Sequence, residues 1–417
     1  MSFYRQTLDN GLEIVAESND AALSTALGFF VRTGSRDETD ELSGVSHFLE
    51  HMAFKGPEGR TAADVNAALD DLGAHSNACT SEEETVFYFK TLPELQEDAV
   101  KLLGDLARPA LRKDDFESEK QVVLEEIKMY DDMPPFGIDE KLREYFWIGH
   151  PLARSVSGTL ESVSALTPEA MRDYWERRYV PNNIVFAATG RVDFNLLTRW
   201  VDAAFGGLRS GDAPRAERRA AGRRGTTLLT RASATQEYVL QATSAPSCRD
   251  DVDALLLGAL ILGGDVGSRL FWELVDSGRA EAASLDCSLY VDSGMMVAQL
   301  ECSPEDAREN LSTMRALFSE AITDGVTEEE LVRVKNKTLA RVALQGERPL
   351  SRLYSVGDDW VSTGKYRSTS DLMAKIRQTT LEEVNAALRK YPPLDPFTIA
   401  VGPLTELDVC GEVARSE

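Results

Sequence analysis

Residues 43–56 read SGVSHFLEHMAFKG and place His47, Glu50 and His51 within five consecutive positions. Residues four apart on a helix share a face, so this spacing puts both imidazoles on one side, with Glu50 one turn from His47. Two such imidazoles can bind one metal ion, and a nearby carboxylate can accept a proton from a metal-bound water. The stretch therefore predicts a helix that carries most of a hydrolytic zinc site.

A catalytic zinc usually has three protein ligands and one open position, so the HxxEH pattern needs a third ligand from elsewhere in the chain. Glu126 is the candidate, because it lies in ESEKQVVLEEIKMYDD (117–132), where apolar residues at helical spacing predict a partly buried helix. Glu119 lies seven residues earlier, two turns along the same side. The neighbouring Glu125 is the competing ligand, and Glu126 is preferred because it keeps the seven-residue step from Glu119.

This combination of residues closely resembles the pitrilysin-type inverzincin metallopeptidases, a family that includes mitochondrial processing peptidase and insulin-degrading enzyme. The resemblance implies that His47, His51 and Glu126 bind zinc. It further implies that Glu50 activates the attacking water and that the carboxylate of Glu119 supports the site from outside the ligand set. The resemblance is dense over the first half of the chain and looser in the second.

An isolated HxxEH pattern can also be a solvated polar face of a helix. Three observations disfavour that interpretation. His47 and His51 are two of only four histidines in the chain, and a glutamate-rich helix follows at the family's distance. The third is that apolar residues interleave the histidines, namely Phe48, Leu49, Met52 and Phe54.

Residues 74–92, AHSNACTSEEETVFYFKTL, predict two strands around an acidic turn at 81–84. The family resemblance implies that Asn77 and Ala78 lie on an exposed edge strand beside the zinc, where a substrate peptide adds as an extra strand. Main-chain pairing of this kind binds many sequences, while side-chain pockets select among them. His75, in the same stretch, is expected to be structural.

The chain has 417 residues, which is too long for one ordinary core and fits two domains of about 200 residues. No run approaches the ~18 uncharged apolar residues of a membrane span. The start, MSFYRQTLDNGLEIV, lacks the basic-then-apolar layout of a signal peptide. These features predict a soluble, cytoplasmic protein.

The formal net charge of −24 argues against binding nucleic acid or an anionic membrane through bulk electrostatics. Such a surface would attract cationic peptides, although it more often only maintains solubility. The cysteines are odd in number and form no CxxC pair, which predicts free thiols rather than disulfides or a cysteine-zinc site. They are Cys79, Cys248, Cys287, Cys302 and Cys410.

The order of strand and helix signals predicts an α+β fold of two internally repeated αβ domains, each a mostly antiparallel sheet with helices packed on it. Residues 209–225 contain six arginines and no large apolar side chain, so they predict a linker between a domain at 1–208 and a domain at 226–417. The resemblance implies that only the first domain binds metal and that the second completes a substrate chamber.

The second half departs from the family pattern at two positions. Active members commonly carry an arginine and a tyrosine that hold the substrate carbonyl and the developing oxyanion, and the aligned positions here are about Val275 and Ala282. Neither side chain can donate a hydrogen bond. Other donors near the aligned stretch are Tyr290 and Arg279.

We therefore expect a zinc endopeptidase that acts on unfolded or presequence-like peptides, with Glu50 accepting the proton of the attacking water. The alternative is a non-catalytic or structural subunit, which the complete HxxEH pattern with Glu126 disfavours. Family members close a chamber from four αβ units, so two chains of this length are needed. The partner is expected to be a relative that lacks HxxEH, giving a heterodimer, or a second copy of the chain.

Overall fold

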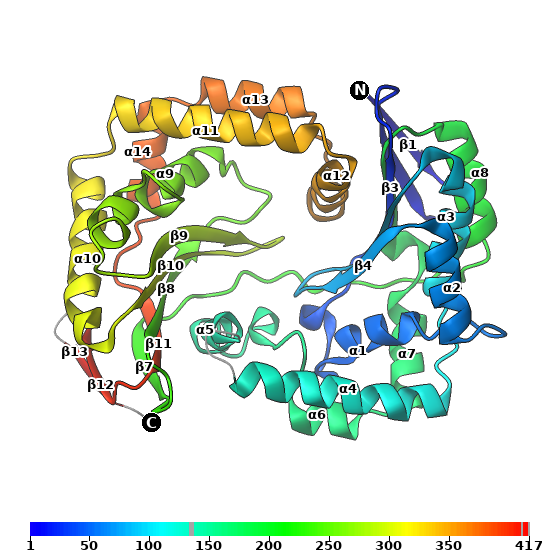
Figure 1. Cartoon of the computed structure of the whole chain (residues 1–417), viewed down its shortest axis with the longest axis horizontal. Coiled ribbons are helices and arrows are strands. Elements are labelled where there is room, and N and C mark those ends of the chain that lie inside the picture. The colour runs from blue at the N-terminus through cyan, green and yellow to red at the C-terminus, as the bar shows by residue number, and fades with distance from the viewer. Residues whose placement is uncertain (133–136, 410–411, 416–417) are drawn as a thin grey trace. The chain divides into compact units, whose positions relative to one another are not determined.

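The computed structural model describes residues 1–132, 137–409 and 412–415, and Cys410 therefore lies outside the described residues. The chain forms two compact units, each built on its own β-sheet with helices on both faces. Figure 1 shows the elements of both units. The predicted α+β class, with two mostly antiparallel sheets covered by helices, is confirmed.

The two units are not simple halves of the chain. The first contains residues 1–129, 154–216 and 343–367, and the second contains 130–153, 217–342 and 368–417. This division differs from the expected domains 1–208 and 226–417 because each unit takes a helical segment from the other half of the sequence. Within these segments, residues 137–153 and 343–367 each cover one face of the sheet in the unit that they join.

The first sheet has the strand order β1-β2-β6-β3-β5-β4. Of the described neighbours, β2 and β6 run parallel and the others run antiparallel. The central β3 is buried along its whole length, as its apolar run TALGFFV predicts, and β4 lies at the edge. The strands are β1 (Ser2–Thr7), β2 (Glu13–Ser18), β3 (Thr25–Val31), β4 (His75–Thr80), β5 (Thr85–Thr91) and β6 (Ile184–Gly190).

Most helices of the first unit cover one face of this sheet and bury their apolar side chains in a shared core. In α1, the residues that enter this core are Val45, Phe48, Leu49 and Met52. Burial of that stripe turns the opposite side of α1, which carries the two histidines, away from the core. The helices are α1 (Val45–Ala53), α2 (Ala62–Leu72), α3 (Gln96–Leu106), α4 (Lys113–Asp132), α6 (Leu160–Ala165), α7 (Pro168–Arg178) and α8 (Phe194–Phe205).

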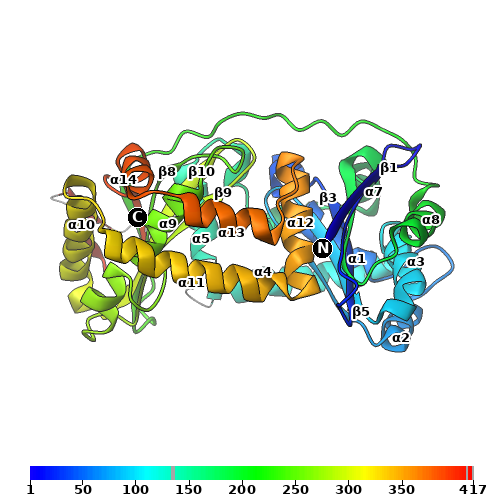
Figure 2. The same ribbon diagram turned by 90° about the horizontal axis from the view of Figure 1, so that it is seen from above.

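Helix α12 (Pro349–Thr363) covers the other face of the first sheet, opposite α3 and α8 (Figures 1 and 2). Its Leu353 and Val356 join a core with residues of β2, β3, β5 and β6. Arg352 donates two hydrogen bonds, of 2.8 and 2.7 Å, to the carboxylate of Glu17 on β2, in a buried ion pair. No helix is expected here from the sequence, although Pro349 occupies a position that favours a helix start.

The second sheet has the order β7-β11-β8-β10-β9, with β7 and β11 parallel. One face packs on α9, α10 and α14, and the other packs on α5. The strands are β7 (Gly225–Thr230), β8 (Glu237–Ala245), β9 (Ala282–Leu289), β10 (Gly294–Cys302) and β11 (Phe397–Gly402), with a separate pair β12 (Glu406–Val409) and β13 (Glu412–Arg415). The helices are α5 (Ile138–Phe146), α9 (Asp253–Gly263), α10 (Ala307–Thr323), α11 (Glu328–Gly346), α13 (Thr369–Gln378) and α14 (Leu381–Lys390).

The arginine-rich stretch has no helix or strand over residues 209–224. Some of its arginines nevertheless contact protein groups. Arg215 donates to both carboxylate oxygens of Asp37, at 2.9 and 2.6 Å, which ties the stretch to the first unit. Among the helices that the structure describes, none combines the length and the apolar character needed to cross a membrane.

Candidate metal centre

The helix that carries the HxxEH pattern begins at a buried carboxyl group. Glu38 accepts hydrogen bonds from the backbone N–H groups of Gly44 and Ser46, at 2.8 and 2.7 Å, at the N-terminus of α1. Gly44 has φ = 89°, a conformation that favours glycine, and this residue turns the chain into the helix. Burial raises the pKa of Glu38 to about 8, although the hydrogen bonds from Ser46 and Gly44 oppose that shift. The start of α1 is therefore held in place by a polar contact inside the fold.

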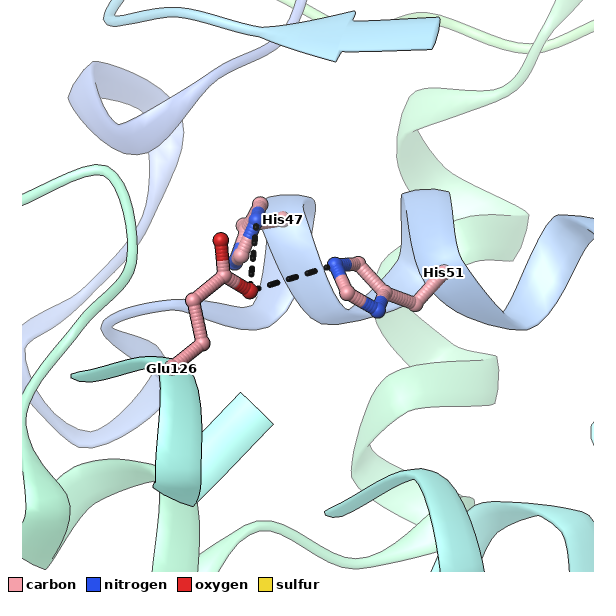
Figure 3. Close-up of side chains that lie close together, drawn as sticks. All are labelled: His47, His51 and Glu126. Carbon is pink, nitrogen blue, oxygen red and sulfur yellow. Dashed lines mark ion pairs between the residues drawn. The ribbon is translucent and has the colours of Figure 1, made fainter. Parts of the chain in front are cut away.

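Three side chains converge where α1 passes α4. His47 and His51 project from α1 toward Glu126 on α4, as Figure 3 shows. Glu126 Oε2 lies 3.8 Å from His47 Nε2 and 3.6 Å from His51 Nε2. One ligand atom from each residue can be chosen so that all three lie within 4.8 Å of one another. The structure thus brings together the three residues that the sequence predicted as ligands.

The two adjacent glutamates of α4 face different surroundings. The Glu126 side chain is 23% exposed and lies against both histidines. The Glu125 side chain is 73% exposed and forms an ion pair of 2.7 Å with Lys128, one turn along the same helix. The geometry therefore favours Glu126 over Glu125 as the third member of the cluster.

Glu119 holds one of the histidines from the side opposite the cluster. Its Oε1 accepts a hydrogen bond of 2.9 Å from His51 Nδ1, and its Oε2 lies 2.5 Å from Lys55 Nζ. This bond places a proton on Nδ1 and leaves the lone pair of His51 Nε2 directed toward Glu126. The carboxylate occupies the supporting position that the family resemblance implied.

The electrostatics of the two histidines differ. Burial and the charge of His51 together lower the pKa of His47 to about 4, against the raising effect of Glu126, so the imidazole of His47 is neutral near pH 7. Burial also lowers the pKa of His51, but the Glu119 hydrogen bond and the carboxylates of Glu50 and Glu126 outweigh it and raise the pKa overall. Neutral imidazole is the form that binds a metal ion.

Glu50 lies beside the cluster and does not belong to it. Burial raises the pKa of its carboxyl group, and a hydrogen bond from the Thr80 hydroxyl opposes that shift. The Thr80 Oγ1 atom donates to Glu50 Oε2 at 2.7 Å, from the last residue of the edge strand β4. One oxygen of Glu50 is thus fixed by the strand on which the resemblance places the substrate.

The donor atoms fit a zinc ion. Two imidazole nitrogens and one carboxylate oxygen are common zinc ligands, and three atoms bound tetrahedrally at 2.0–2.2 Å would lie roughly 3.4 Å apart. The observed separations of 3.6 and 3.8 Å exceed that value by only a few tenths of an ångström. Among the described residues, the buried Nδ1 atom of His47 has no hydrogen-bond partner, in contrast to Nδ1 of His51.

The other two histidines stay away from the cluster. The His75 side chain is on β4 and its ring faces that of Tyr88, with 6.4 Å between the ring centroids. The Nε2 atom of His150 lies 2.7 Å from the carbonyl oxygen of Arg218, and its Nδ1 accepts from the backbone of Leu152. His150 therefore has the hydrogen-bonded, buried surroundings of a structural histidine, whereas the exposed His75 has only the contact with Tyr88.

The edge strand has two faces with different neighbours. Asn77 lies opposite Tyr88 in the register, and Tyr88 packs in the core beneath α12. Ala78 lies opposite Phe87 and packs against the core that includes α1. The two residues named by the resemblance are therefore at the sheet edge, and the face of β4 that carries Ala78 also carries Thr80.

The positions that lack the family's arginine and tyrosine lie in the second unit. Val275 ends a short π-helical segment (Phe271–Val275), and Ala282 begins β9 at the sheet edge. Of the nearby donors, Arg279 forms an ion pair of 2.8 Å with Glu309. Tyr290 is buried, and its ring meets that of Trp147 edge to face.

Thr80 and Lys55 were not predicted from the sequence. Thr80 ends the same strand as Asn77 and Ala78, and Lys55 lies two residues after the end of α1. Both are ordinary polar residues in the sequence, and only the fold shows that they contact Glu50 and Glu119. The spacing of Lys55 four residues after His51 was the one local signal available for it.

Comparisons with known proteins identify the family of the chain. A model of the insulinase domain of peptidase family M16 matches residues 13–160, and a model described as the peptidase M16 inactive domain matches residues 165–338. An uncharacterised zinc protease of Mycobacterium tuberculosis is 35% identical over 392 residues, which cover 92% of this chain and 90% of that protein. An uncharacterised zinc protease of Bacillus subtilis is 30% identical, over 93% of this chain and 95% of its own length.

The fold also matches solved structures. A protease from Helicobacter pylori superimposes with a TM-score of 0.89 at 20% identity and covers 96% of this chain and 99% of its own. A peptidase M16 inactive domain from Pseudomonas fluorescens gives a TM-score of 0.90 at 19% identity, over 98% and 99% of the two chains. At these identities the likeness concerns the fold.

Proposed function

Because the chain belongs to peptidase family M16, as the family models and its relatives show, we propose that it is a zinc-dependent endopeptidase that cleaves unfolded or presequence-like peptides. The convergence of His47, His51 and Glu126 carries this proposal, because a protein that acts only as a scaffold does not need three metal ligands and a neighbouring base. The relatives are named zinc proteases, which supports the choice of metal.

In this proposal His47, His51 and Glu126 hold the zinc ion. The bound ion supplies Lewis-acid chemistry, which polarises a carbonyl oxygen and makes a water molecule more acidic. Glu50 accepts the proton of the attacking water and passes it to the leaving amine. Thr80 orients the Glu50 carboxylate by donating to one of its oxygens, so that the other oxygen remains free to take the proton.

The edge strand β4 suggests how a peptide is held. An extended peptide that pairs with β4 uses its main chain for affinity, which suits substrates of varied sequence. Since Thr80 ends β4 and contacts Glu50, a peptide paired along β4 would run toward the base. Its alternate side chains would point to the two faces that Asn77 and Ala78 define.

Substitution of Glu50 tests the proposal. The Glu50→Gln variant should keep about one zinc per chain and the wild-type melting temperature, because the ligands are untouched, but it should lose at least ~10³-fold in hydrolysis of an unstructured peptide. Glu117→Gln, which changes an exposed glutamate of α4, is the matched control and should retain wild-type activity. Activity of Glu50→Gln within about tenfold of wild type would remove the general-base role.

A second function remains supported by one observation. Val275 and Ala282 stand where active family members commonly carry the two carbonyl-holding side chains, and neither can donate a hydrogen bond. A chain used as a non-catalytic subunit would tolerate that loss. The same assay separates the two functions, because a non-catalytic subunit would show no hydrolysis that depends on Glu50, whether alone or with a companion chain.

A further inference from the structure

The second unit contains a cavity of about 380 Å³ that has no role in the proposed peptidase chemistry. It lies between the C-terminal end of α9, the loop at residues 264–268 and one side of α11. All of its lining residues belong to the second unit, so the cavity is complete within that unit.

Cationic side chains line one wall of this cavity. Arg333, Lys337 and Arg341 are spaced four residues apart on α11 and therefore lie along one side of the helix. This grouping contrasts with the chain as a whole, which has a net charge of −24. Three cations and two carboxylates line the cavity, so its lining has a formal charge of +1 on an acidic protein.

The two carboxylates that also line the cavity are already engaged. Both oxygens of Glu330 accept from Arg269, at 2.7 and 3.0 Å, and one also accepts from the backbone of Thr327. Asp265 accepts a hydrogen bond of 2.7 Å from the N–H of Val266. These bonds reduce the capacity of both carboxylates to neutralise the cations of α11.

The cations differ in how much of their hydrogen-bonding capacity remains. Arg333 forms an ion pair of 2.7 Å with Glu329, and Lys337 donates to the carbonyl oxygen of Val266, leaving other donors on each. Among the described residues, Arg341 forms no hydrogen bond or ion pair. The nearest charge effect is on Asp286: burial raises the pKa of Asp286, and the charge of Arg341 partly opposes that shift. Arg341 is therefore the cation best able to bind a ligand.

An apolar surface lies beside these cations. Ile261 and Val334 are buried side chains of α9 and α11, and Leu260 is partly buried beside them. The loop contributes Gly267, which has φ = +90°, and a Cβ at that position would come within 3.4 Å of Lys337 Nζ. That distance is an ordinary contact, so the positive φ and not the lysine favours glycine at this position.

We propose that this cavity binds a small anionic ligand, in which a carboxylate or phosphate group is carried on a short aliphatic chain. The anionic group contacts Arg341 and Lys337, and the aliphatic part lies against Ile261 and Val334. A single cation without apolar neighbours would bind any anion weakly, and an apolar groove alone would not require charge. The combination selects ligands that have both parts.

Isothermal titration calorimetry of the full chain tests this proposal with defined probes. Hexanoate and hexyl phosphate supply the two anionic groups on the same aliphatic chain, 1-hexanol removes the charge, and acetate removes most of the chain. We expect one or both hexyl anions to bind at least about tenfold more tightly than hexanol and acetate, which corresponds to ~1.4 kcal/mol. The better of the two anions identifies the head group as carboxylate or phosphate.

Substitutions on neighbouring helices provide the matched comparison. Arg341→Gln should weaken binding of the better anion about tenfold, and Arg341→Lys should recover most of that loss because it restores the charge. Arg315→Gln on α10 removes an exposed arginine that does not line the cavity, and it should change affinity less than twofold.

Three results would overturn the proposal. These are equal affinity for hexanol and the hexyl anions, equal effects of Arg341→Gln and Arg315→Gln, and absence of binding by either hexyl anion at millimolar concentration. Thermal melting of each variant shows that the substitution leaves the fold intact. None of these measurements requires peptidase activity, so the outcome is independent of the proposed function.

Discussion

At the scale of single residues, α4 offers two adjacent glutamates with opposite surroundings. Glu126 lies against His47 and His51, whereas Glu125 pairs with Lys128 at the surface. Loss of a group that only supports a ligand typically lowers metal affinity by about 10–100-fold. Removal of a ligand itself should lower the affinity by more than that. We therefore expect Glu126→Gln to lower zinc affinity by at least ~10²-fold, as measured by metal analysis after dialysis against a chelator.

Glu125→Gln is the control for this prediction and should keep about one zinc per chain, since its side chain is turned away from the histidines. Reversal of the two results would assign the third ligand to Glu125 and would require α4 to rotate from the position seen here.

Thr80 allows a second prediction at this scale. Its hydroxyl donates to Glu50, and a hydrogen bond to a charged group contributes roughly 1.5–3 kcal/mol. Thr80→Val keeps the β-branched shape and removes the donor. The variant should lower kcat about tenfold or more while KM changes less than about threefold, because the bond acts on the base and not on peptide affinity.

Thr80→Ser retains the donor and should restore most of kcat, with zinc content unchanged in both variants. Equal impairment of the valine and serine variants would assign Thr80 a packing role only.

At the scale of secondary-structure elements, α12 is attached to the first sheet by a pair of carboxyl groups. Glu84, in the turn between β4 and β5, hydrogen-bonds with Asp358 on α12. Burial raises the pKa of Glu84 to about 7 and that of Asp358 to about 9. The hydrogen bond with Asp358 opposes the shift of Glu84, whereas the charge of Glu84 and the same hydrogen bond add to the shift of Asp358. Other nearby charges also shift these two pKa values. Glu83 raises the pKa of Glu84 and Arg215 lowers it, while Asp359 raises the pKa of Asp358.

The sign of the pH effect follows from proton binding. Between the pKa values of the unfolded chain, near 4, and those of the folded pair, the folded state binds more protons, so the free energy of unfolding falls as pH rises. The contribution of the pair is fully present below about pH 4 and is lost as pH rises through about 7 and then about 9.

Substitution of Asp358 by asparagine removes one of these protonation sites. We expect Asp358→Asn to reduce the loss of stability between roughly pH 5 and pH 9 by about 1 kcal/mol or more, as measured by urea unfolding at several pH values. Asp70→Asn, at an exposed site on α2, should leave the pH dependence unchanged. An unchanged slope in Asp358→Asn would show that the pair does not share a proton.

At the scale of the whole molecule, Val275 and Ala282 of the second unit stand where the family resemblance implies an arginine and a tyrosine that hold the substrate carbonyl. We propose that a companion chain, lacking HxxEH but bearing the arginine and tyrosine, supplies them in a heterodimer. The alternative is a homodimer in which Tyr290 or Arg279 acts instead. The surroundings of these two residues favour the heterodimer, since Arg279 is paired with Glu309 and Tyr290 is buried against Trp147.

A mixing assay tests the partner. The chain alone should hydrolyse unstructured peptides weakly or not at all, and addition of the companion should raise the rate by ~10²-fold, the typical effect of an oxyanion donor. The mixture made with Glu50→Gln should stay inactive, which shows that the zinc-bearing chain performs the chemistry. Strong hydrolysis by the chain alone, unaffected by any companion, would favour the homodimer.

The sequence by itself determined the helix with His47, Glu50 and His51, the helix with Glu119 and Glu126, and the α+β class. These are local properties, because helical spacing places residues three, four or seven apart on one side before any packing occurs. The strand with Asn77 and Ala78 was predictable for the same reason, since a run of strand-forming residues between turn signals predicts a strand. Its place at the sheet edge was implied only by the family resemblance.

Only the tertiary structure decided between Glu126 and Glu125, because the choice depends on how α4 is rotated against α1. Packing likewise connected Thr80 to Glu50 across thirty positions and placed α12 on a sheet formed mainly from the first half of the chain. Contacts such as Arg352 with Glu17 join residues more than three hundred positions apart. Spacing along the chain carries no information about such contacts, because they form only where separate elements bury their apolar faces together.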